Sequence, residues 1–225
     1  MPETKVVVAP RGKMPGHLLD LAPWTMICTD RPVTVDEFYE MVDEDTNAEL
    51  VEGVIIMKSP VSCKHETLFG FLYTMLKQYV REKNLGQVFG SRTAVRITNH
   101  TAREPDLLFV RKEHFDIIHK NDIKGAPDLV IEIVSPHDKP YEMVAKQAEY
   151  EQIGVREFWL IDQLEQRILI YDLGPDGRFV ERVSQGDILE SVTVDGFWIR
   201  IKWLWSELGE FPSTLSIVRD LVKNS

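Results

Sequence analysis

The chain has few cysteines and no long apolar run. Its two cysteines, Cys28 and Cys63, form neither a close metal-binding pair nor a disulfide framework, which favours a reduced compartment. No apolar run approaches the roughly 20 residues that cross a membrane, and no signal peptide opens the sequence. We therefore expect a cytoplasmic protein without a membrane partner.

Basic residues are also in the minority, with 26 Lys and Arg against 36 Asp and Glu and a net charge of −10. The acidic net charge argues against nucleic acid as a partner. The distribution of charge along the chain weakens this argument. Between Lys77 and Lys112 there are eight basic residues and three acidic ones. Phosphate contacts need a local basic surface rather than a basic protein, so nucleic acid remains a possible partner. The alternative is that these side chains form an ordinary solvated face.

What is present is a succession of strands and helices typical of an α/β protein. The 225 residues suffice for one large domain with extensions, and we expect an irregular N-terminal arm over residues 1–33 and a single domain over 34–225. Periodicity and capping residues predict the elements of that domain. Helices are expected near 34–41, 62–83, 112–119, 139–153 and 204–208, a hairpin at 48–58, and strands near 87–98, 106–110, 128–134, 156–162, 167–173, 178–184 and 197–201.

The central stretch runs from Pro127 to Pro136 and places apolar residues around one carboxylate, Glu132. Such a run predicts a strand that is buried on both faces of a sheet. An ionised Glu there costs several kcal/mol unless a cation compensates it. The sequence therefore predicts a metal ion or a lysine beside Glu132, or a shifted pKa that leaves it neutral. The alternative is an inert, salt-bridged Glu at the open end of a strand.

Asp106 is the acidic residue that can meet Glu132. It opens the apolar strand at 106–110, and adjacent strands lie about 4.8 Å apart. Asp128 cannot, because four residues along the same strand place it about 13 Å away. Two carboxylates on neighbouring strands favour a hard divalent cation with oxygen ligands. The alternative is that Asp106 and Glu132 are unrelated acids at strand ends.

A lysine would complete a site for phosphodiester hydrolysis, which needs an activated water and stabilisation of charge at phosphorus. In one familiar layout of such sites the lysine lies two residues after the glutamate, but this position is Val134 here. Lys146 lies near the apolar face of the next helix and could reach Glu132. The alternative is an ordinary exposed lysine. Glu49, on the first strand of the hairpin, and His65, in the first turn of the long helix, are further candidates, although a lone histidine is more often structural.

Several segments together resemble the Uma-two family of restriction-endonuclease-like proteins, within the PD-(D/E)XK nuclease superfamily. The resemblance runs from about Thr34 to Leu173 and depends on the order and spacing of its parts. It implies a restriction-endonuclease-like mixed β-sheet core flanked by helices, to which the strands expected at 167–173 and 178–184 add a C-terminal β-hairpin region. The parts are Glu49-Leu50-Val51-Glu52-Gly53, Ser59-Pro60, His65, Pro105-Asp106, Glu132-Ile133-Val134-Ser135-Pro136, Lys146, Tyr150, Gly154-Val155, Glu157-Phe158-Trp159 and Asp162.

The resemblance also implies a set of site residues. Asp106 and Glu132 would be ligands of Mg²⁺ or Mn²⁺, with the backbone carbonyl of Ile133 as a third ligand. Lys146 would be the catalytic lysine, moved from the strand to the neighbouring helix. Glu49 would be an accessory catalytic acid from the first strand.

Two functions are compatible with these expectations. The leading one is a Mg²⁺-dependent endonuclease that hydrolyses DNA phosphodiester bonds as a homodimer, with His65 as a possible accessory residue. The other is a catalytically silent nucleic-acid-binding or assembly module on the same fold. One departure from the family is Glu142, where relatives often have Asp. Aromatic residues near the C-terminus offer apolar surface for a dimer unless they belong to the core: Phe197, Trp198, Trp203, Trp205 and Phe211.

Overall fold

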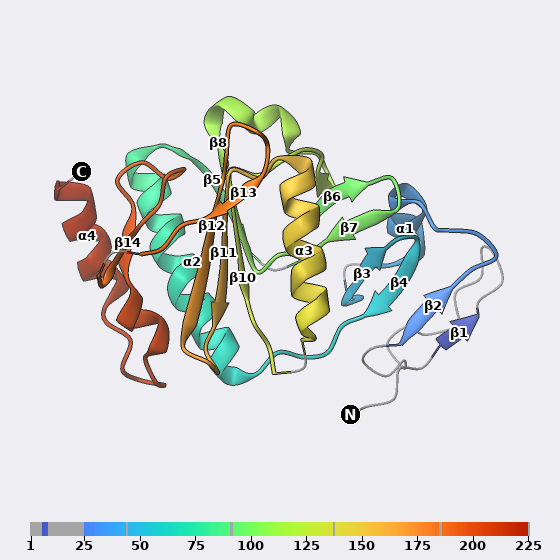
Figure 1. Ribbon diagram of the computed structural model, residues 1–225, viewed down its shortest axis with the longest axis horizontal. Helices are drawn as coiled ribbons and strands as arrows, with labels where there is room; N and C mark the ends of the chain where they lie inside the picture. The colour runs from blue at the N-terminus through green and yellow to red at the C-terminus, as the bar shows by residue number, and fades with distance from the viewer. Residues whose placement is uncertain are drawn as a thin grey trace. The chain divides into compact units, whose positions relative to one another are not determined.

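The computed structural model describes residues 6–8, 25–43, 45–90, 92–136, 138–184 and 186–224. The chain divides into two compact units (Figure 1). The first holds Met1–Pro60, Arg92–Glu104 and His119–Gly125, and the second holds Val61–Ser91, Pro105–Ile118 and Ala126–Ser225. The arm expected over residues 1–33 falls largely outside the described residues, and the limits of that arm and of the domain at 34–225 stay predictions.

The first unit is built on a seven-stranded sheet in the order β1-β2-β4-β3-β7-β6-β9. A helix, α1 (Val35–Met41), begins at the predicted capping box, in which the Thr34 hydroxyl accepts from Glu37 N–H and the Glu37 carboxylate accepts from Thr34 N–H. The strands are β1 (Val6–Val8), β2 (Met26–Cys28), β3 (Ala48–Val51), β4 (Val54–Met57), β6 (Ala94–Thr98), β7 (Thr101–Arg103) and β9 (Asp122–Ile123).

The predicted hairpin is confirmed as β3 and β4, joined by a tight turn at Glu52 and Gly53. Gly53 has a φ of +78°, and a Cβ there would lie 2.4 Å from the Cβ of Pro32. Only glycine combines this backbone conformation with so close an approach. The turn therefore depends on the glycine that the sequence places at the junction of the two strands.

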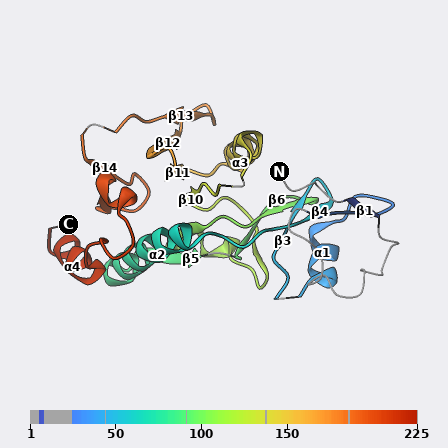
Figure 2. The ribbon, with the colours of Figure 1, turned by 90° about the horizontal axis from the view of Figure 1, so that it is seen from below.

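The second unit carries a six-stranded sheet in the order β13-β12-β11-β10-β8-β5. Its two long helices, α2 (Cys63–Lys83) and α3 (Pro140–Ile153), lie on opposite faces of this sheet (Figure 2). The unit also contains a two-stranded sheet, β14 (Ile188–Glu190) with β15 (Trp198–Arg200). The strands of the main sheet are β5 (Gly86–Gly90), β8 (Leu107–Arg111), β10 (Leu129–Ile133), β11 (Glu157–Asp162), β12 (Arg167–Leu173) and β13 (Phe179–Glu181).

The face of the sheet towards α2 forms the main hydrophobic core. Alternate residues of β10, Leu129, Ile131 and Ile133, pack there with Leu72 and Met75 of α2. Because side chains alternate along a strand, the residues between them face α3 on the other side. The predicted buried strand is thus confirmed, and its alternation directs Glu132 towards α3.

Two expectations about boundaries are wrong. The strand expected over 87–98 is two strands in different sheets, β5 and β6, separated at Arg92 (φ +70°). Helix α2 ends at Asn84 in a left-handed conformation rather than at Gly86. Gly86 instead begins β5, where a Cβ would lie 2.1 Å from the carbonyl oxygen of Val110. Glycine is needed there for the close approach of two strands, not for a helix end.

The C-terminal region also differs from expectation. A 3₁₀ helix, η3, covers Ile201–Trp205 in place of the helix expected at 204–208, and a further helix, α4 (Thr214–Asn224), was not predicted. The aromatic residues suggested for a dimer surface belong to the core, because Phe197 is buried and Trp198, Trp203, Trp205 and Phe211 pack against the same cluster. The homodimer therefore stays a prediction without these residues to support it.

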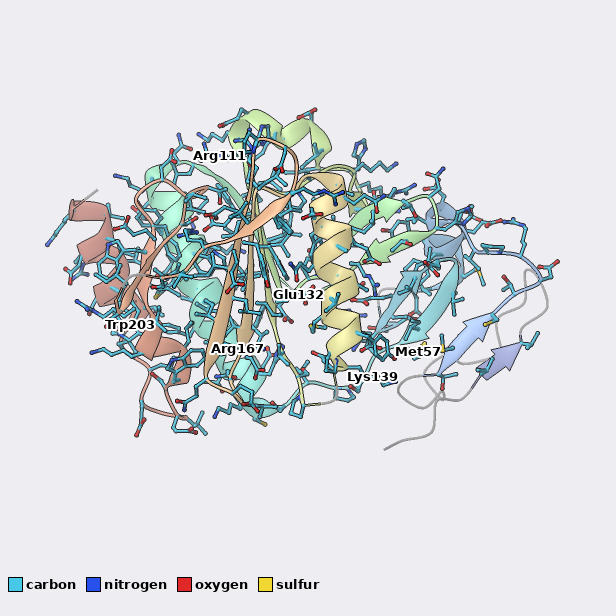
Figure 3. All side chains as sticks on the ribbon, in the orientation of Figure 1. Met57, Arg111, Glu132, Lys139, Arg167 and Trp203 are labelled. Carbon is cyan, nitrogen blue, oxygen red and sulfur yellow. The ribbon has the colours of Figure 1, made fainter. Side chains whose placement is uncertain are left out.

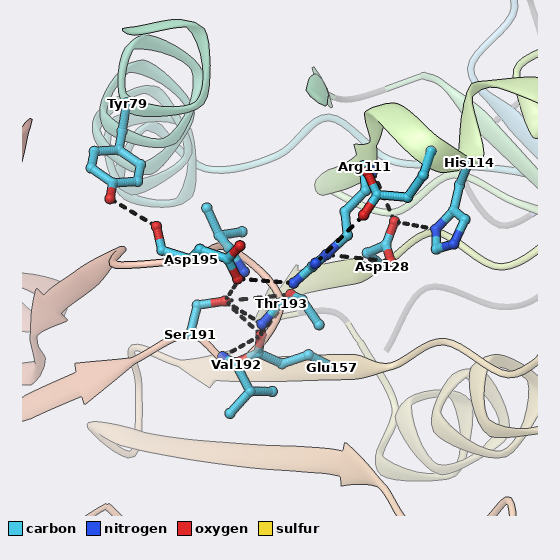
Figure 4. A network of polar contacts seen from close by, with 11 residues as sticks. Tyr79, Arg111, His114, Asp128, Glu157, Ser191, Val192, Thr193 and Asp195 are labelled. Carbon is cyan, nitrogen blue, oxygen red and sulfur yellow. Dashed lines mark hydrogen bonds and ion pairs between the residues drawn. The ribbon is translucent and has the colours of Figure 1, made fainter. Parts of the chain in front are cut away.

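Buried polar networks fix the C-terminal segment to the sheet (Figure 4). Glu157 of β11 is fully buried, and one carboxylate oxygen accepts from Trp159 Nε1 at 2.8 Å and Arg182 Nη2 at 2.7 Å. The other oxygen accepts from the hydroxyls of Ser191 at 2.6 Å and Thr193 at 2.7 Å, and from two backbone N–H groups. So many donors compensate the burial of this charge.

A second network explains Asp128, the acid that spacing excludes from the site. Its side chain is 1% exposed, and one oxygen accepts from the backbone N–H of Arg111 at 2.8 Å and from Nδ1 of His114 at 3.0 Å. Asp128 therefore joins β8 and the following 3₁₀ helix, η2 (Lys112–Ile117), to the start of β10. Its role is structural.

Within the residues described, no helix has the length and apolar character needed to cross a membrane.

Candidate functional site

Glu132 is buried within the sheet of the second unit, with only 4% of its surface exposed. Strand β10 pairs with β8 on one side and β11 on the other, and all five of its residues are buried. Lys146 Nζ lies 2.9 Å from each carboxylate oxygen of Glu132. The sequence predicts a metal ion, a lysine or a shifted pKa to offset the buried charge of Glu132, and the structure shows a lysine there.

Helix α3 supplies two buried side chains to Glu132. Figure 3 shows the position of Glu132 next to this helix. Lys146 is 5% exposed, and Tyr150, one turn later, is fully buried and donates its hydroxyl to Glu132 Oε1 at 2.7 Å. Residues four apart lie on one face of a helix, so the two side chains converge on the same carboxylate. The ring of Tyr150 packs against Phe158 of β11 with centroids 5.5 Å apart, which holds this face of α3 on the sheet.

Asp106 lies immediately before β8 and next to Glu132 in the strand register. Leu107 pairs with Ile131 in the antiparallel ladder, so the next residues outward are Asp106 and Glu132. The backbone N–H of Ile133 donates to Asp106 Oδ2 at 2.7 Å. This contact fixes the Asp106 carboxylate at the end of the sheet, where its side chain keeps 17% of its surface exposed.

His65, in the first turn of α2, faces Asp106 and the strand end. Its Nε2 lies 3.4 Å from Asp106 Oδ2 and 3.2 Å from the carbonyl oxygen of Ile133. Burial lowers the pKa of His65, but the hydrogen bond to Asp106 and the charge of that carboxylate outweigh it, and the pKa is raised above its ordinary value. Nδ1 is buried and has no hydrogen-bond partner among the described residues. His65 thus brings a proton donor to two of the oxygens predicted to bind metal.

Glu49 and Glu142 each form contacts with residues other than Glu132 and Asp106. Glu49, on β3 of the first unit, is 2% exposed and accepts from Lys58 and Arg103, each at 3.2 Å. Glu142 accepts from the backbone N–H of Lys139 at the start of α3, a contact that a shorter Asp side chain would make less easily. The accessory role of Glu49 stays a prediction.

The oxygen ligands that these residues offer suit a hard divalent cation. Asp106 and Glu132 are neighbours in the register, and the Ile133 carbonyl converges with Asp106 on one nitrogen of His65. No group of three Asp, Glu, His or Cys side chains that could hold a metal ion occurs within the described ranges. Mg²⁺ sites commonly use one or two carboxylates and retain several waters, so two carboxylates and a carbonyl fit this ion. They do not fit Zn²⁺, which takes mainly His and Cys ligands.

Tyr150 is the residue that site prediction from the sequence missed. It belongs to the resembling segments, but no chemistry was assigned to it. Its spacing of four from Lys146 was the available signal, because any residue that shares this helix face must also approach Glu132. A tyrosine at a buried position needs a partner for its hydroxyl, and here that partner is the carboxylate.

Comparisons with known proteins bear on the family and the fold of the chain. A family model described as "Uma2: Putative restriction endonuclease" matches residues 35–202. Among solved structures, the chain is similar to a crystal structure of "a putative nuclease belonging to DUF820" from Anabaena variabilis, at 22% identity and a TM-score of 0.64, covering 77% of this chain and 98% of that one. The comparison with curated proteins gave no match.

At that identity the structural likeness shows the fold, and it confirms the predicted mixed α/β, restriction-endonuclease-like architecture. The family model spans most of the chain and confirms the resemblance seen in the sequence. This protein therefore belongs to the Uma2 family of restriction-endonuclease-type proteins.

Proposed function

We propose that this protein is a metal-dependent nuclease that hydrolyses DNA phosphodiester bonds. The observation that carries the proposal is the buried Lys146 ammonium, which faces both oxygens of Glu132 while Asp106 stands next in the register. A buried cation beside two acids is costly as mere structure, since apolar residues of similar volume often serve as well. Such an arrangement is typical of sites where charge is needed for chemistry.

The residues have separate roles in this proposal. Asp106, Glu132 and the Ile133 carbonyl would hold Mg²⁺ or Mn²⁺, which when bound supplies an acidified water and neutralises charge on the phosphate. Lys146 orients the attacking water or stabilises the negative charge that develops on the phosphoryl oxygens. Tyr150 holds Glu132 in one orientation through the hydrogen bond that its hydroxyl donates.

His65 supports the other carboxylate. Its Nε2 is close to both Asp106 and the Ile133 carbonyl, so it orients two oxygens that would face the cation. In this proposal His65 is an accessory residue that positions Asp106. The homodimer and the accessory role of Glu49 belong to the same proposal and are supported by the resemblance rather than by contacts.

The direct test is a panel of single-stranded, double-stranded and structured DNA and RNA, incubated with Mg²⁺ or Mn²⁺. We expect cleavage of DNA that disappears in EDTA and in Glu132→Ala. Cleavage that persists in Glu132→Ala would indicate a contaminant or another site. If the folded wild-type protein binds DNA and cleaves none of the substrates, the protein is a catalytically silent binding module.

Tyr150→Phe should lower both Mn²⁺ affinity and cleavage rate, by about tenfold each, because Glu132 loses the donor that fixes its orientation. Removing a buried hydroxyl that donates to a carboxylate also costs about 1.5–3 kcal/mol of stability. Calorimetry, single-turnover cleavage and thermal melting measure the three effects. The first two separate a positioning role from a merely structural one.

Tyr79→Phe is the matched control for this experiment. Tyr79 is also fully buried, and its hydroxyl donates to the backbone carbonyl of Asp195 at 2.8 Å, within the core on the α2 side of the sheet. Tyr79→Phe should lower stability and leave Mn²⁺ affinity unchanged. Equal metal affinity in the two variants would show that Tyr150 has no positioning role.

A further inference from the structure

A groove of about 390 Å³ lies in the second unit between α3 and the strands β11 and β12. Its floor includes Leu160, Leu169 and Tyr171 of the sheet, and Met143 and Gln147 line the side formed by α3. This volume is within the range of pockets that hold small ligands. No step assigned to the proposed site uses these residues.

The groove lies next to the proposed site in the sheet. Leu160 is the register partner of Glu132 on the adjacent parallel strand, so the two side chains lie on the same face of the sheet. Gln147 directly follows Lys146 on α3, and Val134, at the edge of the groove, follows Ile133 after β10. A ligand over Leu160 would therefore lie on the strand adjacent to that of Glu132, with the two backbones about 4.8 Å apart.

The chemistry of the lining suits a flat, uncharged and partly polar ligand. The surface is mostly apolar and contains one aromatic ring, Tyr171, which is half-buried and stacked on Phe158 with centroids 6.1 Å apart. Gln147 lines the groove together with Tyr171 and brings an amide to it. Aromatic rings and amides are the groups with which proteins stack and recognise unpaired bases.

The charge of the groove excludes the phosphate backbone as its occupant. Among the described residues that line it, Asp138, Asp162 and Glu165 are acidic and Arg167 is the one cation. An excess of carboxylates repels phosphates, whereas a neutral base meets no such penalty. Nucleic acid would thus reach the groove with a base rather than with its backbone.

We propose that this groove binds a nucleobase that is unstacked from its neighbours, next to the phosphate at Lys146. The inference deepens the proposed nuclease function and depends on it for the identity of the ligand. It assigns the substrate class: DNA that is single-stranded, or unpaired near the point of cleavage. Duplex DNA would have to lose base pairing locally at a cost of a few kcal/mol.

The rim of the groove suggests a second copy of the chain as the competing occupant. Val144 is 65% exposed and Leu164 is 60% exposed, and exposed apolar side chains around a groove also occur at protein interfaces. The carboxylates of Asp138, Asp162 and Glu165 would repel an acidic surface of a second copy at this groove. The experiment therefore includes a measurement of mass.

The test uses the wild-type protein with Ca²⁺ in place of Mg²⁺ and an oligonucleotide that carries 2-aminopurine, whose fluorescence is quenched by stacking. We expect the 2-aminopurine fluorescence of the single strand to be quenched when the protein binds it. The matched duplex should bind at least tenfold more weakly. Tyr171→Leu should weaken single-strand binding by between about fivefold and a hundredfold and restore the fluorescence. Val144→Glu, at the exposed rim, should weaken binding without altering the core.

Phe179→Leu is the matched control, because Phe179 packs against Tyr171 with centroids 5.9 Å apart but does not line the groove. It should bind like the wild type. Equal binding of single strand and duplex, unchanged in Tyr171→Leu, would overturn the proposal, as would a dimer mass in scattering that Val144→Glu reduces to one chain.

Cleavage with Mg²⁺ separates this inference from the function on which it depends. If single strand and duplex are cut equally and Tyr171→Leu has no effect, the groove proposal fails and the nuclease function stands. If the protein quenches the 2-aminopurine fluorescence of the single strand but never cleaves it, the nuclease function fails and the base-binding groove stands.

Discussion

Replacing Lys146 with methionine is expected to slow phosphodiester cleavage by about 100-fold to 1,000-fold. Methionine keeps the apolar stem and the approximate length of the side chain but removes the charge that would face the phosphate. The loss corresponds to roughly 3–4 kcal/mol of transition-state stabilisation, which is typical when one preorganised donor is removed. Single-turnover rates in saturating Mg²⁺ measure it directly.

The burial of Lys146 adds a second consequence. Because the ammonium faces both oxygens of a buried carboxylate, its removal should also lower the free energy of unfolding by about 3–5 kcal/mol without metal. A bound divalent cation should restore part of this loss. The rate must therefore be measured at a temperature where circular dichroism shows the variant folded, with Lys146→Arg as a charged companion.

Lys139→Met is the control, since Lys139 is the other lysine near this site. It caps the start of α3, and its ammonium lies over the ring of Tyr141, 5.6 Å from the centroid. Its replacement should change the rate by less than about threefold, an effect of roughly 0.6 kcal/mol. If Lys139→Met abolishes cleavage and Lys146→Met does not, the catalytic lysine has been assigned to the wrong residue.

Replacing Glu157 with alanine is expected to lower the free energy of unfolding by about 3–5 kcal/mol, because it leaves several buried donors without an acceptor. The carboxylate accepts from the indole of Trp159, the guanidinium of Arg182, and the hydroxyls of Ser191 and Thr193. In a chain of this size, the loss corresponds to a drop of roughly 10 °C in melting temperature.

Glu181→Ala provides the comparison for Glu157→Ala. Glu181 is exposed on the edge strand β13 of the same sheet, and its removal should change stability by no more than about 0.5 kcal/mol. A Glu157→Ala protein that melts with the wild type would show that the network in Figure 4 contributes little to stability.

The main features of the second unit's sheet could be predicted because its signals are local. The apolar run around Glu132, the capping residues of the helices and Gly154 after α3 all determine structure within a few residues. The pairing of β8 with β10 followed from two successive apolar strands. The two strands therefore predict that Asp106 and Glu132 are neighbours.

What could not be predicted depends on contacts between distant residues. Nothing local distinguishes one long strand at 87–98 from β5 and β6, which pair in different sheets. Several donors to the Glu157 carboxylate come from residues more than 30 positions later in the chain, such as Ser191 and Thr193. The hydroxyl of Tyr150 could be placed only once the packing of α3 on β11 was known.

The most direct measurement of the central claim is calorimetric titration of Mn²⁺ into the wild type, Asp106→Ala and Asp116→Ala. Asp116 is an exposed aspartate outside the proposed site and serves as the control. If Asp106 and Glu132 hold one cation beside Lys146, Mn²⁺ should bind the wild type and Asp116→Ala alike, and at least tenfold more weakly to Asp106→Ala, a difference of about 1.4 kcal/mol. Equal Mn²⁺ affinity in all three proteins would contradict a shared metal site at these two carboxylates.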